Sequence, residues 1–251
     1  MKRRHPLGLG LAAALSLFVV LGFASAQVDA QVSAQMRAQA STQESCTDDA
    51  MIVFDASGSM SGNVMLGMAT AITRIDEVRS ALGKVLPIAA RYRRVGLITY
   101  GPGPYNQCNV ELNLTPKPNA AQRIMREVDV ITPAGKTPLS AAVERAAEVL
   151  DFRNKPGVIV VLTDGEETCG GSPCELGKKR QDAAPRLTVH VIAYRTSYFS
   201  WTGEQSILGI KCLAEENNGL YVTADTQDEL ISAFRETLSC PMISKASARL
   251  R

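Results

Sequence analysis

The sequence lacks the residue patterns on which several classes of protein depend. It contains only two histidines, His5 and His190, and no Cys-x-x-Cys pair, which argues against a structural zinc site. Its serines do not stand in the Gly-x-Ser-x-Gly frame of many serine hydrolases, and no phosphate-binding P-loop is present. These absences argue against zinc binding, serine hydrolysis and a nucleotide-driven activity.

A strong charge of one sign is also lacking beyond the N-terminal segment. Basic residues at Lys2, Arg3 and Arg4, an apolar run over residues 7–23 and small residues at 24–26 form the pattern of a cleaved signal peptide. Removal of residues 1–26 takes away three positive charges and no negative one, so the formal net charge falls from +2 to −1. A near-neutral chain gives no indication of a nucleic-acid partner.

We therefore expect a secreted or periplasmic protein. No second hydrophobic stretch approaches the length that crosses a membrane, so no membrane span is expected after cleavage. The alternative is that the apolar run is retained as an anchor, although it is short for a span and interrupted by glycines. Residues 27–45, rich in Gln, Ala and Ser, predict a flexible linker. Residues 46–240 then form one large domain, followed by a tail at 241–251.

Six cysteines follow the signal peptide. An even number in an exported protein predicts up to three disulfides, with fifteen possible pairings. Two of the cysteines are close enough in sequence to bridge the short loop between them, and two bracket the domain, whose ends often lie near each other. The expected pairs are therefore Cys169–Cys174, Cys46–Cys240 and, from the remaining two, Cys108–Cys212.

Apolar runs alternate with amphipathic patterns in the manner of an α/β protein. Strands are expected at residues 51–54, 95–100, 110–114, 158–163, 187–194 and 220–223. Helices are expected at residues 72–85, 120–128, 139–150, 174–184 and 204–216, and after the capping box of residues 226–229. The loop between the second and third strands is short, which predicts an antiparallel third strand at the edge of a mostly parallel, doubly wound sheet.

The first of these helices carries two further predictions. Its polar face, Arg74, Asp76, Glu77 and Arg79, is expected to point to solvent. Pro87 is expected to end the helix, because proline removes a backbone donor and collides with the preceding turn.

Oxygen-bearing side chains follow two of the buried strands. Asp55, Ser57 and Ser59 come at every second position directly after the first strand, and Asp164 follows the fourth. Thr137 stands in a turn that opens a helix. In an open α/β sheet ligands bind at the carboxyl ends of the strands, so we expect these side chains to converge there. Such a set of carboxylates and hydroxyls suits a hard divalent cation.

The pattern Asp55-x-Ser57-x-Ser59, with Thr137 and Asp164, resembles the metal-ion-dependent adhesion site of the von Willebrand factor type A (vWA) domain family. The resemblance covers roughly residues 48–240. It implies a six-stranded, Rossmann-like sheet in the order 3-2-1-4-5-6. It also implies that one aspartate acts partly through water, so that the bound ion stays electrophilic. We expect Mg²⁺, with Mn²⁺ or Ca²⁺ as alternatives, and a protein partner that supplies a Glu or Asp carboxylate.

Each member of this set has an ordinary structural explanation as well. The serines could bond backbone amides in a turn or cap a helix, Thr137 stands at a helix N-cap, and Asp-Gly is a common turn dipeptide. The metal itself could be a purely structural clip, with the partner bound elsewhere. The five residues together, at one predicted edge of the sheet, favour metal-dependent binding.

Several nearby residues have two interpretations. Glu166 and Glu167 could tune the ion or repel wrong partners, and Glu166 could contact a partner, although exposed loop charge is the simpler interpretation. The loop after the fifth strand carries three aromatic residues, Tyr198, Phe199 and Trp201, which could form a partner patch or close the core. His190 alternates with apolar residues in a strand, and a structural role is favoured for it.

An enzyme is the main alternative class. Haloacid-dehalogenase-type phosphatases, which depend on Mg²⁺, also place an aspartate after a buried first strand. Their chemistry needs a second aspartate two residues later as general acid. Ser57 occupies that position here, so the sequence argues against an enzyme and favours adhesion or another protein–protein interaction.

Overall fold

The computed structural model describes residues 46, 48–62, 72–183, 186–196 and 204–240. The predicted signal peptide, linker and tail lie outside these residues, as does the aromatic loop at 198–201. Among the described helices, none combines the length and apolarity needed to cross a membrane.

A six-stranded sheet forms the centre of the domain, in the order β3-β2-β1-β4-β5-β6. The strands are β1 (Asp49–Asp55), β2 (Val95–Tyr100), β3 (Val110–Lys117), β4 (Gly157–Thr163), β5 (Leu187–Tyr194) and β6 (Tyr221–Ala224). All neighbouring pairs are parallel except β2–β3, which is antiparallel and places β3 at an edge. Both the predicted strand order and the antiparallel edge strand are confirmed.

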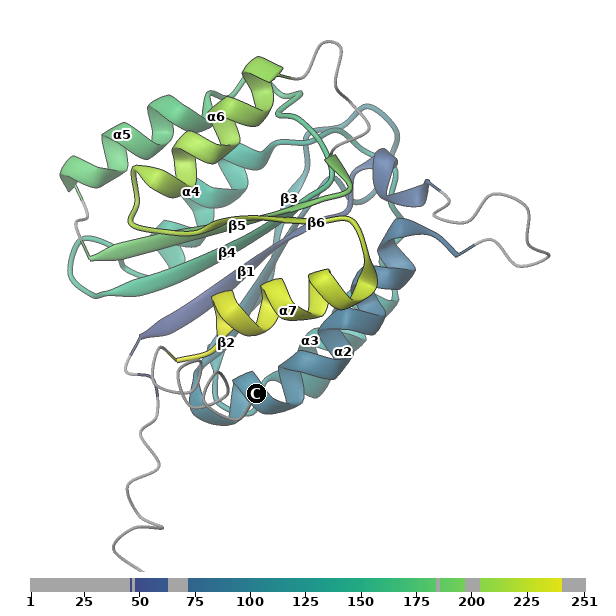
Figure 1. The fold of residues 1–251 in the computed structure, drawn as a ribbon, viewed down its shortest axis with the longest axis horizontal. Coiled ribbons are helices and arrows are strands. Elements are labelled where there is room, and N and C mark those ends of the chain that lie inside the picture. The colour runs from purple at the N-terminus through teal and green to yellow at the C-terminus, as the bar shows by residue number, and fades with distance from the viewer. Residues whose placement is uncertain (1–45, 47, 63–71, 184–185, 197–203, 241–251) are drawn as a thin grey trace, which may run out of the picture. The chain divides into compact units, whose positions relative to one another are not determined.

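Two layers of helices cover the sheet (Figure 1). The helices are α2 (Arg74–Tyr92), α3 (Ala121–Asp129), α4 (Leu139–Val149), α5 (Pro173–Ala183), α6 (Glu204–Glu215) and α7 (Gln227–Leu238), and a short 3₁₀ helix, η1 (Gly58–Ser61), follows β1. Helices α2, α3 and α7 pack on one face of the sheet. Helices α4, α5 and α6 lie on the other.

Strand β1 is buried on both faces, which explains its unbroken apolar sequence. Because side chains alternate along a strand, Ile52 and Phe54 join the core under α2 and α7, whereas Met51 and Val53 join the core under α4. A site at the end of β1 is thus attached to a strand that is packed on both faces.

The prediction that Pro87 ends the first helix is wrong. Helix α2 continues through it to Tyr92, and Pro87 itself is exposed. The ring and the lost hydrogen bond therefore fall on the solvent side, while Leu86 and Ala89 remain buried against the sheet. Burial of the apolar face outweighs the local cost of the proline.

Two of the three predicted disulfides are also wrong. Cys46 pairs with Cys240 as expected, but the other bonds are Cys108–Cys169 and Cys174–Cys212. Cys174 lies in the first turn of α5, which packs against α6 and its Cys212. Nearness in sequence suggested Cys169–Cys174, which left Cys108 with Cys212; helix packing and loop contacts instead decide which cysteines meet.

Candidate metal centre

The turn after β1 gathers three of the predicted ligands. Asp55 is the last residue of β1, and its Oδ1 accepts the backbone N–H of Ser57 at 2.8 Å. The 3₁₀ helix η1 then turns the chain so that the hydroxyls of Ser57 and Ser59 lie 2.9 Å apart. The sequence did not predict this 3₁₀ helix, but its effect is the convergence that the alternating pattern indicated.

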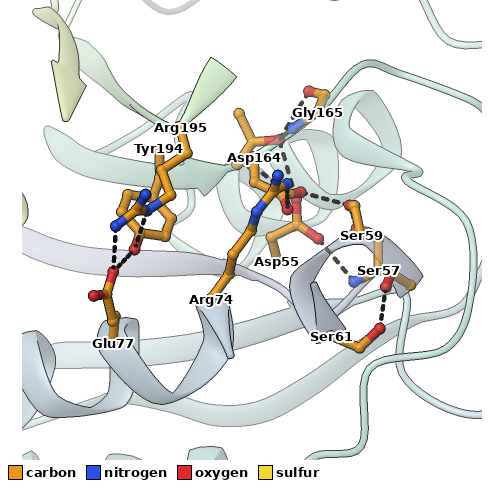
Figure 2. A network of polar contacts seen from close by, with 12 residues as sticks. Asp55, Ser57, Ser59, Ser61, Arg74, Glu77, Asp164, Gly165, Tyr194 and Arg195 are labelled. Atoms are coloured by element: carbon orange, nitrogen blue, oxygen red, sulfur yellow. Dashed lines mark hydrogen bonds and ion pairs between the residues drawn. The ribbon is translucent and has the colours of Figure 1, made fainter. Parts of the chain in front are cut away.

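Asp164 joins the same cluster from β4, the neighbour of β1 in the sheet (Figure 2). The Ser59 hydroxyl donates to Asp164 Oδ1 at 2.6 Å, and the Asp164 backbone N–H donates to Asp55 Oδ2 at 3.3 Å. Both carboxylates are fully buried. The structure therefore brings together four of the five predicted residues through side-chain contacts, although more than 100 residues separate the two aspartates.

Thr137 lies in a third loop, which packs against the first. The Gly58 N–H donates to the Gly135 carbonyl at 2.9 Å, and Ser57 forms an isolated parallel bridge with Gly135. Thr137 itself is buried, and its backbone is tied to Thr168, two residues beyond Glu166, by hydrogen bonds in both directions. The Thr137 loop therefore joins the loop after β1 to the loop after β4.

Gly101 permits this close approach of loops. It has φ +75°, and a Cβ there would lie 2.8 Å from the Ser57 Cα and 2.6 Å from the Lys136 carbonyl oxygen. Only glycine fits such a position. The Cys108–Cys169 disulfide then links the loop that follows Gly101 to the loop after β4. The loop between β2 and β3 is thus held to the loop of Thr137 by backbone contacts and to the loop after β4 by a covalent bond.

Two donors to Asp55 were missed at the level of sequence. The Tyr100 hydroxyl donates to Asp55 Oδ2 at 2.8 Å, and the Thr163 hydroxyl donates to the same oxygen at 3.1 Å. Tyr100 is the register partner of Asp55 in β2, and Thr163 ends β4. Tyr100 and Thr163 both end strands that flank β1, and this could have identified them once the strand order was known.

The electrostatics of the site reflect two acids buried side by side. Burial, followed by the nearby charge of Asp164, raises the pKa of Asp55, and the donors Ser57 and Tyr100 oppose the rise. Burial also raises the pKa of Asp164, although Ser59 and Arg74 donate to it. Burial and Asp55 raise the pKa of the Tyr100 hydroxyl well above its ordinary value, so Tyr100 remains a donor.

Arg74, the first residue of α2, reaches into the site. Its Nη1 lies 2.7 Å from Asp164 Oδ2, and its side chain is only 16% exposed. The prediction of a solvated face on this helix is therefore wrong for Arg74. It is also wrong for Glu77, which is 17% exposed and accepts hydrogen bonds from Tyr194 and Arg195 (Figure 2). Arg79 is only 20% exposed as well, and it donates to the backbone carbonyls of Val128 and Ile131.

The donor set fits a hard divalent cation. In the described ranges no group of three or more Asp, Glu, His or Cys side chains forms a metal site; this cluster has two carboxylates, and its remaining donors are hydroxyls. Oxygen ligands of mixed charge, without nitrogen or sulfur, are those that Mg²⁺, Mn²⁺ and Ca²⁺ accept. Arg74 already places one positive charge beside Asp164.

Glu166 and Glu167, the two acidic residues that follow Asp164, have different surroundings. Glu167 is no exposed loop charge: its two carboxylate oxygens accept the backbone N–H groups of Ser140 and Cys169, each at 2.8 Å. It thereby fixes the start of α4 against the loop after β4. Glu166 is half-buried beside Asp164 and Gly165, where it lines a small cavity.

His190 has the structural role that the sequence favoured. Its Nδ1 accepts the Leu220 backbone N–H at 3.0 Å. Burial, with a smaller contribution from the charge of Arg93, lowers the pKa of His190 to about 4, so it is neutral near pH 7.

Comparison with known proteins agrees with this architecture. Residues 50–167 match the family model "von Willebrand factor type A domain". An uncharacterised Bacillus subtilis protein, YwmC, is 26% identical over 206 residues, which are 77% of this chain and 83% of YwmC. The matched family segment contains all five predicted ligands.

Solved structures share the fold at low sequence identity. The von Willebrand factor domain of the type V pilus tip protein Mfa5 from Porphyromonas gingivalis superposes with a TM-score of 0.56 at 12% identity, covering 79% of this chain and 95% of that one. The pilus adhesin SpaC from Lactobacillus rhamnosus GG has a TM-score of 0.55 at 13% identity, covering 78% of this chain and 31% of SpaC. Residues 50–167 therefore match the von Willebrand factor type A domain, and the solved structures show that this chain shares the fold of such domains.

Proposed function

We propose that this protein is exported and binds another protein through a divalent cation held by Asp55, Ser57, Ser59, Thr137 and Asp164. The proposed ion is Mg²⁺, and the partner supplies a Glu or Asp carboxylate to it. The observation that carries the proposal is the contact between the Ser57, Ser59 and Asp164 oxygens at 2.6–2.9 Å, beside a second buried carboxylate.

The chain's own residues have distinct parts in this proposal. Asp55 and Asp164 supply negative charge, while the hydroxyls of Ser57, Ser59 and Thr137 supply neutral oxygens. Two carboxylates at most balance a divalent cation, so the bound ion keeps an attraction for one further anionic oxygen. Tyr100 and Thr163 hold Asp55 in place through its Oδ2.

Export and adhesion have support from separate features. Three disulfides join the six cysteines, and such bonds are typical of oxidising compartments. Structural neighbours include a pilus tip protein and a pilus adhesin, which is consistent with a role at the cell surface. Binding is favoured over phosphatase chemistry, because Ser57 stands where that chemistry needs an acid and its hydroxyl contacts Ser59.

Metal binding is tested by titrating Mn²⁺ into the metal-free protein, using electron paramagnetic resonance or calorimetry. Ser59→Ala is expected to weaken Mn²⁺ binding by about tenfold or more, in the range seen when a group that orients a metal site is lost. Ser61→Ala is the matched control, because Ser61 lies in the same 3₁₀ turn but donates to the Gly58 carbonyl. Absence of Mn²⁺ binding by the wild-type protein would contradict the proposal.

Partner binding needs a second experiment. Immobilised wild-type protein is exposed to extracellular proteins of the producing cells in Mg²⁺, and bound proteins are eluted with EDTA. Thr137→Ala is expected to lose this EDTA-sensitive fraction while its circular dichroism stays unchanged. If the same proteins bind fully in EDTA, the metal has only a structural role and the partner binds elsewhere.

A further inference from the structure

We propose that Arg74 competes with the divalent cation for Asp164 and thereby lowers the metal affinity of the site. This inference rests on the proposed function, since it concerns the same ion. It assigns a regulating role to a residue outside the predicted ligand set.

The geometry places Arg74 where it must interact with any bound ion. Its Nη1 contacts Asp164 Oδ2 at 2.7 Å, while Asp164 Oδ1 accepts the Ser59 hydroxyl (Figure 2). Asp164 is fully buried, so water screens the ion pair less than at an open surface. The Arg74 backbone N–H donates to the Gly62 carbonyl at 2.9 Å, which anchors the start of α2 just after η1.

The position of Arg74 is unfavourable for the helix itself. It is the first residue of α2, where the helix dipole favours negative charge, and Asp76 and Glu77 in the same turn follow that preference. Thr73 and Asp76 already form a complete capping box, so the helix needs no arginine to begin. The contact with Asp164 provides the compensating interaction.

Charge balance indicates the direction of the effect. With both carboxylates ionised, Asp55 and Asp164 carry two negative charges, and Arg74 offsets one of them. A divalent cation added beside Arg74 would bring three positive charges against two negative ones. The guanidinium must therefore move away or reduce the affinity of the ion through repulsion. A partner carboxylate would restore the balance, so metal and partner should bind with positive cooperativity.

The test compares Mn²⁺ dissociation constants of four proteins: wild type, Arg74→Ala, Arg74→Lys and Arg91→Ala. Arg91 is an exposed residue in the last turn of α2, roughly 25 Å along the helix from Arg74, and its removal causes the same change in net charge. An opposite charge beside a carboxylate shifts its proton affinity by about 10- to 1,000-fold, so Arg74→Ala is expected to bind Mn²⁺ at least about tenfold more tightly. Arg91→Ala should match the wild type.

The outcomes separate this inference from the proposed function. If the wild type binds Mn²⁺ and Arg74→Ala binds it equally or more weakly, Arg74 supports the site and the competition is refuted, while metal binding stands. If none of the four proteins binds Mn²⁺, both ideas fail. Arg74→Lys keeps the positive charge, so tight binding by the alanine variant together with near wild-type binding by the lysine variant supports an electrostatic cause. Arg74→Gln replaces the alanine variant if circular dichroism shows that the latter is misfolded.

Discussion

The hydrogen bond between Tyr100 and Asp55 allows a sharp test of how the site is held. Tyr100→Phe removes one hydroxyl from a fully buried ring and leaves the shape of the ring unchanged. The hydroxyl donates to a carboxylate, and a hydrogen bond to a charged group contributes about 1.5–3 kcal/mol. Asp55 Oδ2 keeps Thr163 and the Asp164 N–H as donors, so the expected loss lies near the lower end, at about 1.5–2 kcal/mol.

The assay is urea unfolding in EDTA, which removes any contribution from metal. At pH 8 Asp55 is ionised and the full loss is expected. At pH 5 the raised pKa of Asp55 keeps it mostly protonated, and a neutral hydrogen bond contributes only about 0.5–1.5 kcal/mol. The free energy of unfolding lost on Tyr100→Phe should therefore be smaller at pH 5 than at pH 8. Tyr105→Phe is the control, because Tyr105 is 81% exposed and the same chemical change there should cost less than about 0.5 kcal/mol.

Two results would refute this reasoning. If Tyr100→Phe unfolds at the same urea concentration as Tyr105→Phe at pH 8, the buried hydroxyl does not stabilise the carboxylate. If Tyr100→Phe loses the same free energy of unfolding at pH 5 and at pH 8, the hydrogen bond exists but the charge of Asp55 contributes nothing to it.

Three further predictions concern stability. Because the pKa values of the two buried aspartates are raised, the folded state binds protons more tightly than the unfolded state. The metal-free protein should therefore lose stability as the pH rises from about 4 to about 7. In thermal melts, Mg²⁺ should restore more of this stability at pH 8 than at pH 5. Pro87→Ala should stabilise the protein by about 1–2 kcal/mol in urea unfolding, because Pro87 is exposed inside a helix; a loss would contradict this. Cys46→Ser with Cys240→Ser opens a loop of 194 residues and should lower the free energy of unfolding by up to about 5 kcal/mol with unchanged Mn²⁺ affinity. Cys108→Ser with Cys169→Ser should weaken Mn²⁺ binding, because this bond holds the loop after β4, which follows Asp164, to the loop between β2 and β3.

Much of the fold followed from local patterns. Strands β1 and β4 are continuous apolar runs because both of their faces are covered, and the capping box at Thr226 and Glu229 marks the start of α7 as predicted. Pro87 does not end α2, because the burial of the opposite helix face outweighs the local effect of the proline. Local rules fail here where tertiary packing contributes more free energy than backbone propensity.

The sequence by itself determined that Asp55, Ser57, Ser59 and Asp164 would meet, because buried parallel strands end at one edge and carry their following residues there. Only the tertiary structure decided that Arg74 reaches Asp164, that Tyr100 supports Asp55 and that Cys108 pairs with Cys169. These contacts join residues 45 to 90 positions apart in sequence, and no local periodicity encodes them. They depend on strand order, helix placement and loop packing, which arise when the whole chain is assembled.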